Sequence, residues 1–292
     1  MWNYDGKSEV TTENLSYIPR FQSLCEQFKI APVYLCNYET LNDSAFCAYI
    51  NDKVKSGLCE VGIHIHAWNN PPHYELCTQY NGNPYLIEYP YEIMRFKFAE
   101  TYNLIHKRFG IKPISHRAGR WVMNEDYFKI LEDFDIKVDC SYTPCVSWMN
   151  SPGATIPHGC DYENVPDSSH MVGSILEVPM TIRKFRTFFG RTFKSLIKNS
   201  LIPKLVWLRP ATNGITELKN LVDRVCLRSD GADYAELMLH SSELMPGGSP
   251  YFTDEKSIDT LYEDLSALFK HVTKRGFQPV TLNEYFKIKG SE

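Results

Sequence analysis

The sequence predicts an α/β fold built on a mainly parallel sheet, either open or closed into a barrel. Short apolar or β-branched runs alternate along the chain with longer segments in which apolar residues recur every three or four positions. The length of 292 residues is within the range of one α/β barrel, and 43 % hydrophobic with 23 % charged residues is typical of a globular protein. We therefore expect a single domain that covers residues 1–292.

Seven runs have the length and composition of buried strands. They are Ala31–Cys36, Glu60–His66, Lys112–Arg117, Ile136–Cys140, Ser174–Pro179, Ala235–His240 and Phe277–Thr281. The first predicted helix begins after only about a dozen residues, which contain no convincing strand, although a strand normally precedes that helix in a βα architecture. Either the fold begins with a helix, or its first strand is missing from this sequence.

Helical periodicity is clearest over Asp254–Lys274, where seven apolar residues from Ile258 to Val272 follow the spacing of one buried stripe. Thr253 is a candidate N-cap, and Gly276 follows the predicted end. Four further helices are predicted from the same kind of spacing. They cover Glu13–Phe28, Tyr91–Phe109, Asn124–Phe134 and Ile215–Val225.

Composition excludes several classes of function. With 31 Lys and Arg against 35 Asp and Glu, the formal net charge of −4 argues against binding to nucleic acid or an anionic membrane. No apolar run is long enough to cross a bilayer, and the first residues lack the pattern of a signal peptide. Nine irregularly spaced cysteines are expected to be free, mostly buried thiols in a reducing cytoplasm. Neither a glycine-rich phosphate loop nor a Gly-x-Ser-x-Gly motif occurs.

The run Glu60–Trp68 carries the sharpest chemical feature, a His-x-His pair at the end of a predicted strand. The two-residue period places His64 and His66 on the same face, with Cα atoms roughly 6.5 Å apart. Two imidazoles at that separation can converge on one metal ion. The alternative is a pair of structural histidines that hydrogen-bond to the backbone or to water.

A second strand end, Ser115–Trp121, presents Arg117 and Arg120, whose guanidinium groups suit carboxylates. At least one of these arginines is expected to be structural. Gly119 allows a tight backbone there, and His116 is expected to be structural because it alternates away from Arg117.

A third strand end leads into His240, placed for proton transfer near neutral pH, with Glu243 as its partner or a solvated acid. The alternative is a loop histidine bonded to nearby serines.

The segment Ser141–Gly173 is rich in Pro, Gly, Ser, Asn and Asp and is predicted to be a long, functional loop. Within it, Trp148 could form an apolar wall or simply pack in the core.

These three strand ends, in this order, resemble those of the NodB-type polysaccharide deacetylases, which belong to carbohydrate esterase family four. The resemblance is greatest to the branch found with O-antigen and exopolysaccharide synthesis genes, and it covers essentially the whole chain. Its best segments are Glu60–Pro72, Ser115–Trp121 and Leu237–Pro250. The resemblance implies a distorted (β/α) barrel of about seven parallel strands and one divalent metal ion, commonly Zn²⁺.

The resemblance also implies roles for single residues. His64 matches the first metal histidine, and the usual second ligand falls at Trp68, so His66 is the replacement candidate. Arg117 matches the arginine that holds the catalytic carboxylate, and His240 matches the general acid.

Trp148 matches the hydrophobic wall around the acetyl group. In the family, the end of the first strand supplies an aspartate as third metal ligand, and this strand is the one that the sequence lacks. Asp5 is the only aspartate before the first predicted helix, and its context is turn-like rather than strand-like.

The implied function is metal-dependent removal of N-acetyl groups from an amino sugar of a surface polysaccharide or its precursor. The alternative is a non-catalytic relative that keeps the barrel as a glycan-binding or assembly module. The missing acidic ligand favours this alternative, whereas the retained histidines and Arg117 favour the enzyme. In either case the expected partner is an N-acetylated glycan and the expected location is the cytoplasm.

Overall fold

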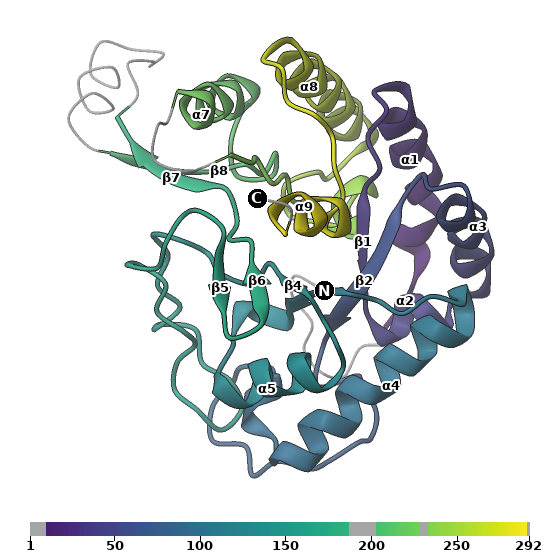
Figure 1. Cartoon of the computed structure of the whole chain (residues 1–292), viewed down its shortest axis with the longest axis vertical. Coiled ribbons are helices and arrows are strands. Elements are labelled where there is room, and N and C mark those ends of the chain that lie inside the picture. Colours follow the sequence, from purple (N-terminus) through teal and green to yellow (C-terminus); the bar gives the residue numbers. More distant parts are fainter. Residues whose placement is uncertain (1–9, 187–202, 228–232, 291–292) are drawn as a thin grey trace.

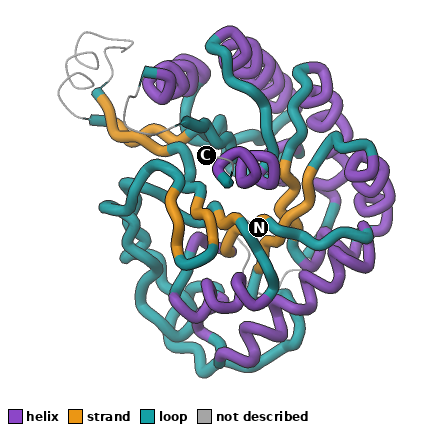
Figure 2. Tube along the Cα trace, viewed as in Figure 1, coloured by secondary structure: helices purple, strands orange, loops and turns teal. Residues whose placement is uncertain are grey.

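The computed structural model describes residues 10–186, 203–227 and 233–290, and its main feature is a six-stranded sheet (Figures 1 and 2). In spatial order the strands are β1 (Val33–Cys36), β2 (Glu60–Ile65), β3 (Ser115–Ala118), β4 (Val138–Asp139), β6 (Ile175–Glu177) and β5 (His170–Val172). The pairs β1–β2, β2–β3, β3–β4 and β4–β6 are all parallel, whereas β5 is antiparallel to β6. A mixed α/β fold with a mostly parallel sheet is therefore confirmed.

A separate pair of antiparallel strands, β7 (Ile182–Phe185) and β8 (Lys204–Trp207), was not expected from the sequence. Ile182 lies opposite Trp207 in this pair, and Phe185 lies opposite Lys204. The barrel of about seven parallel strands stays a prediction, because the described residues form one six-stranded and one two-stranded sheet.

Most helices lie around the outside of the strands, as Figure 1 shows for α1, α3, α4, α5, α7 and α8. The α-helices are α1 (Ile18–Gln27), α2 (Tyr38–Asn42), α3 (Ser44–Lys55), α4 (Tyr91–Phe109), α5 (Glu125–Asp133), α7 (Ile215–Cys226), α8 (Glu255–Lys274) and α9 (Leu282–Lys289). Short 3₁₀ helices are η1 (Glu13–Tyr17), η2 (Leu86–Glu88), η3 (Gly119–Trp121) and η4 (Ser241–Leu244). In the view of Figure 1, α9 lies inside the ring of outer helices.

The five predicted helices are confirmed, with small changes at their ends. The predicted helix at 13–28 is divided into η1 and α1, and α8 takes its N-cap from Asp254 rather than from the preceding threonine, because the Asp254 carboxylate accepts from the backbone N–H of Ser257. Two helices, α2 and α3, were missed between the first two strands, and α9 was missed near the C-terminus.

Two predicted strands are wrong. Residues 235–240 and 277–281 belong to no strand. The first of these segments makes isolated contacts instead of a ladder: the backbone N–H of Met238 donates to the carbonyl of Leu208, and that of Glu236 donates to the hydroxyl of Thr181. Apolar composition made these segments resemble strands, but composition alone does not supply a neighbouring strand with which to pair.

A cavity of about 910 Å³ follows the outer edge of β1. Seven consecutive residues, Ile30–Cys36, line it on one side, and nine consecutive residues, Asp233–Ser241, line it on another. Successive side chains of a strand point to opposite faces, so an unbroken run of lining residues indicates that the backbone edge of β1 faces the cavity. Among the described residues β1 pairs only with β2, and the missing first strand stays a prediction.

The core explains why the strand ends are held in place. β2 is held firmly in the core, because Val61, Ile63 and Ile65 are each at most 1 % exposed. The fully buried Phe98 and Ile105 of α4 belong to the same apolar cluster.

All nine cysteines are free thiols and most are buried, as expected. No helix within the described ranges has the length and apolarity needed to cross a membrane.

Candidate functional site

The C-terminal end of β2 brings His64 and His66 together, as their spacing predicts. β2 is hydrogen-bonded on both sides, by β1 and by β3, and His64 is in register with Arg117 of β3. The two imidazole rings meet at an interplanar angle of 77°, with their centroids 4.7 Å apart. Their Nε2 atoms lie 3.1 Å from each other, so both rings point the same nitrogen at one place.

The outer nitrogen of each ring is fixed by a hydrogen bond. Nδ1 of His64 lies 2.8 Å from the backbone carbonyl oxygen of Arg117, so Nδ1 donates and Nε2 keeps a lone pair. Nδ1 of His66 lies 3.2 Å from Nδ2 of Asn37. Because Oδ1 of Asn37 already accepts from the N–H and hydroxyl of Thr40, Nδ2 must donate to His66. The proton of His66 is therefore on Nε2, between the two rings.

Both histidines are neutral at physiological pH. Burial lowers the pKa of His64 well below its ordinary value, and the neighbouring His66 lowers it further. Burial also lowers the pKa of His66 to about 3, and the charge of His240 acts in the same direction. Neutral imidazole is the form that binds a metal ion.

The pair fits two ligand positions of a divalent ion. Two zinc–nitrogen bonds of about 2.0–2.1 Å at a tetrahedral angle span about 3.3 Å, close to the 3.1 Å between the two Nε2 atoms. Coordination by His66 through Nε2 requires its ring proton to move from Nε2 to Nδ1, which would then donate and could no longer accept from Asn37. Within the described ranges no group of three or more His, Cys, Asp or Glu side chains could hold an ion, and Asp5 lies outside these ranges.

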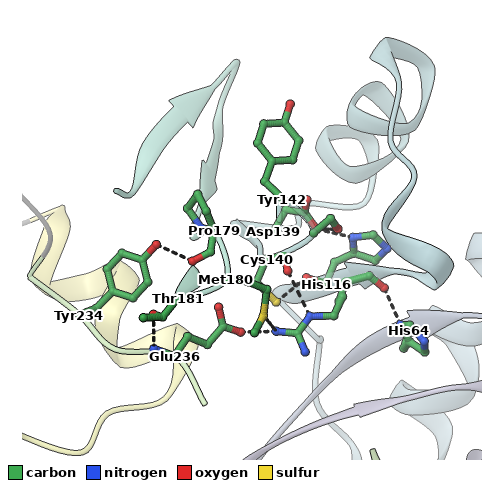
Figure 3. A network of polar contacts seen from close by, with 12 residues as sticks. His64, His116, Asp139, Cys140, Tyr142, Pro179, Met180, Thr181, Tyr234 and Glu236 are labelled. Carbon is green, nitrogen blue, oxygen red and sulfur yellow. Dashed lines mark hydrogen bonds and ion pairs between the residues drawn. The ribbon is translucent and has the colours of Figure 1, made fainter. Parts of the chain in front are cut away.

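Arg117 holds a carboxylate that the sequence analysis missed. Its Nη2 donates to Oε1 of Glu236, and its Nε donates to the carbonyl of Cys140 at 3.1 Å (Figure 3). Oε2 of Glu236 is buried and has no hydrogen-bond partner in the described part of the chain. Burial raises the pKa of Glu236 to about 7, although the Arg117 guanidinium acts to lower it. A signal was present in the sequence, since Glu236 is the one charged residue of an otherwise apolar run that ends at His240.

His240 is placed between two side chains of opposite charge. Its Nδ1 lies 3.1 Å from Nη2 of Arg209 and 3.5 Å from Oε1 of Glu243, and these two residues pair with each other. Glu243 is fully buried and also accepts from the backbone N–H of His240 at 3.1 Å. Burial would raise the pKa of Glu243, but the hydrogen bond with His240 and the charge of Arg209 hold it below its ordinary value. Glu243 is thus the partner of His240 rather than a solvated acid.

The site residues share one cavity wall. Arg117, Glu236 and His240 all line the cavity along the edge of β1. The side chain of His240 is 47 % exposed, whereas those of Arg117 and Glu236 are 11 % and 14 % exposed. The exposed imidazole of His240 and the largely buried ion pair of Arg117 and Glu236 therefore line the same cavity.

His116 is structural, as expected. It is fully buried, with Nδ1 2.7 Å from Oδ1 of Asp139 and Nε2 2.8 Å from the hydroxyl of Tyr127. The hydroxyl of Ser141 donates to Asp139 and accepts from the backbone N–H of Ala118 (Figure 3 shows the His116–Asp139 contact). Burial would raise the pKa of Asp139, but hydrogen bonds from His116 and Ser141 contribute to holding it below its ordinary value. This network fixes the end of β3.

Arg120 is the structural arginine of the predicted pair. It donates to the carbonyls of Asn83 and Pro152, and its guanidinium lies 4.1 Å from the ring centroid of Tyr85. Gly119 is needed beside it, because a Cβ atom there would lie 2.1 Å from the carbonyl oxygen of Ile65.

Trp148 lies in the long loop, which is confirmed over most of 141–169, and its ring lies near other aromatic rings. Its ring centroid is 6.4 Å from that of Trp207, which in turn is 6.1 Å from Trp121. Its indole N–H donates to the hydroxyl of Thr143 at 2.9 Å. The structure therefore groups Trp148 with an aromatic cluster, and its role toward a substrate stays a prediction.

No protein-family model matches the chain, and no curated protein matches it. Among solved structures, it is similar to a protein named as a polysaccharide deacetylase from Mycobacterium smegmatis, at 15 % identity and TM-score 0.48, over 92 % of this chain and 81 % of the other. A family 4 acetyl xylan esterase from Clostridium thermocellum, in complex with a cobalt ion, matches at 15 % identity and TM-score 0.48, over 97 % and 88 %. A CE4 family pseudoenzyme from Bacillus anthracis matches at 13 % identity and TM-score 0.33, over 51 % and 50 %. Because each TM-score is below 0.5, we base the functional assignment on the side chains of this chain.

Proposed function

We propose that this protein is a NodB-type, metal-dependent hydrolase that removes N-acetyl groups from an amino sugar of a surface glycan or its precursor. One observation carries the proposal: the Nε2 atoms of His64 and His66 converge to 3.1 Å at a strand end. The outer nitrogen of His64 donates to a backbone carbonyl, as that of a metal-binding histidine does, whereas the outer nitrogen of His66 accepts from Asn37. The free cysteines support a reducing compartment, the cytoplasm, for this activity.

We assign the ion to His64 and His66, with Zn²⁺ as the first choice because imidazole nitrogen suits it. A divalent ion held there would supply Lewis acidity and a water of lowered pKa. Both histidines are neutral, which favours this assignment. The rest of the ligand set must come from outside the described residues, from water or from substrate.

The chain's own residues have separate tasks in this proposal. Arg117 orients Glu236, whose partner-free Oε2 accepts a proton. His240 directs Nδ1 at Arg209 and Glu243, so we assign its Nε2 to donate a proton to the departing sugar amine. The reaction breaks the acyl carbon–nitrogen bond and forms acetate and a free amine.

A second candidate function is a non-catalytic glycan-binding or assembly module. The observation that favours it is the lack of a third ligand near His64 and His66 among the described residues. Catalytic zinc sites commonly have three protein ligands, so two imidazoles alone bind the ion weakly.

Metal analysis separates the two candidates. We expect the purified wild-type protein to hold about one Zn²⁺ per chain by mass spectrometry of the metal content, and to release acetate from N-acetylglucosamine oligomers. His64→Ala with His66→Ala is expected to lose both properties, whereas His106→Ala, an exposed histidine of α4, keeps them. Wild-type protein without metal, and without acetate release after Zn²⁺ is added, would favour the non-catalytic module.

A further inference from the structure

A smaller cavity of about 380 Å³ lies where the loop after β2 meets α4. Its lining residues are Trp68, His73, Tyr74, Glu75, Tyr89 and Lys97. Trp68 joins this cavity to the histidine pair, because its ring stacks on His66 with centroids 4.8 Å apart and planes 9° apart. A ligand in this cavity would therefore lie one aromatic ring away from the proposed metal ligands.

The wall of this cavity is pre-organised by Lys97, which is 1 % exposed. Its ammonium group donates to three backbone carbonyls of the loop, those of Ala67 at 3.0 Å, Asn70 at 2.5 Å and Pro72 at 2.7 Å. It also lies 4.6 Å from the ring centroid of Tyr89. All three ammonium protons thus have acceptors, and the loop is tied to α4 before any ligand binds.

Aromatic surface and polar edges alternate around the cavity. Tyr74 is 44 % exposed, and its ring centroid lies 6.1 Å from that of Tyr89. The indole N–H of Trp68 is buried and has no acceptor within the described ranges. A buried donor without an acceptor is costly, and an oxygen atom of a ligand would satisfy it once the Trp68 ring turned this N–H toward the cavity.

The charges of the lining residues disfavour an anionic ligand. The ammonium protons of Lys97 are already hydrogen-bonded to the three loop carbonyls, and Glu75 adds an acidic group to the wall of the cavity. Aromatic faces pack against apolar C–H surface, while His73 and Glu75 can bond to hydroxyl groups. A cavity of this size is at the small end of ligand sites, which suits a single six-membered ring.

We infer that this cavity is a subsite for a neutral sugar ring of the glycan, next to the ring whose acetamide reaches His64 and His66. The inference rests on the proposed function for the identity of the polymer. The sugar's C–H face packs on Tyr74, and one of its oxygens accepts from Nε1 of Trp68. Occupation of this subsite holds the chain in register with the histidine pair.

The probe is N,N′-diacetylchitobiose, a neutral disaccharide, titrated by calorimetry into the full chain as purified. Tyr74→Ala deletes the exposed aromatic face, and Trp68→Phe deletes the N–H while keeping a ring against His66. Each is expected to weaken binding roughly three- to tenfold, the range of a lost aromatic contact or hydrogen bond. Tyr80→Ala is the matched control, because Tyr80 is a 36 % exposed tyrosine of the same loop that does not line the cavity.

The outcomes separate this inference from the proposed function. Weaker binding by both variants, with Tyr80→Ala like wild type, supports the subsite even if no acetate is ever released. No binding by wild type, or equal binding by wild type, Tyr74→Ala and Trp68→Phe, overturns it even if acetate is released. Repeating the titration with His64→Ala, which cannot hydrolyse the probe, tests whether binding depends on the proposed metal site.

Discussion

His240 shows how much a single residue depends on its neighbours. Arg209 and Glu243 both face its Nδ1, so the other ring nitrogen is the one assigned to the substrate. We expect His240→Ala to lower the rate of acetate release by roughly 10²–10⁴, the usual contribution of a general acid. Bound Zn²⁺ should be unchanged in the same preparation.

Metal analysis of the variant is the critical measurement. If His240→Ala loses its Zn²⁺, then His240 is a ligand and the general-acid role is wrong. Arg209→Gln serves as a companion variant, because it keeps the imidazole and removes a group that orients it. It should lower the rate less than His240→Ala does.

Glu236 gives a prediction about pH. Its folded-state pKa of about 7 is above the ordinary value of 4.5, so between these values the folded chain holds a proton that the unfolded chain has lost. Glu236 therefore contributes stability below pH 4.5 that is lost as the pH rises to 7. We expect urea unfolding of Glu236→Gln to show a smaller loss of stability than wild type from pH 4.5 to 7.

Glu263→Gln, an exposed carboxylate of α8, is the control and should follow wild type. An identical pH dependence in Glu236→Gln and wild type would contradict the assigned titration of Glu236. At pH 7 the same variant should lose roughly 10²-fold or more in acetate release if Glu236 accepts the proton.

The sequence could predict some of these residues and not others. His64 and His66 are two apart on one strand, so local geometry is enough to pair them. Arg117 and Glu236 are 119 residues apart, and only the fold brings them together. Glu236 was therefore missed although its partner was identified.

At the scale of an element, α4 and the loop after β2 are joined by one ammonium group. Burial lowers the pKa of Lys97 to about 8, yet its three carbonyl acceptors hold it in place. Lys97→Met would leave those carbonyls without their donor, at a cost of roughly 2–4 kcal/mol in the free energy of unfolding. Chemical denaturation measures this, with the exposed Lys107→Met of the same helix as control. Equal stabilities of the two variants would show that the three contacts contribute nothing.

Elements with a strong local pattern were predicted well. α8 has many turns and a continuous apolar stripe, so its periodicity is unambiguous. α3 was missed although its Asp43 cap and the buried Phe46 and Ile50 are local signals. Residues 235–240 have the composition of a strand, but strand formation depends on a partner that composition does not reveal.

For the whole molecule, a metal ion that binds only the folded chain must raise its stability. At a free Zn²⁺ concentration 100 times the dissociation constant the gain is about 2.7 kcal/mol. We expect thermal unfolding of wild type to shift upward with Zn²⁺ and downward with a chelator. The shift should be absent in His64→Ala and present in His106→Ala. A shift that survives His64→Ala would place the ion elsewhere.

The sheet as a whole was only partly predictable. Alternation of strand and helix indicated parallel pairing, and β1, β2, β3, β4 and β6 follow it. The closure of a sheet depends on strand tilt and register, which are set by distant parts of the chain. The pair of β7 and β8 likewise depends on contacts across an intervening segment.

The edge of β1 has a consequence for behaviour in a crowded solution. Its backbone donors and acceptors face a cavity that Asp233–Ser241 line on another side, so a second polypeptide could pair with this edge only after that wall had moved. The side chains of Val33, Tyr34 and Leu35 are only partly exposed. Molecules of this chain should therefore add to one another along β1 only under conditions that partly unfold them, and the intact fold should resist such growth at high concentration.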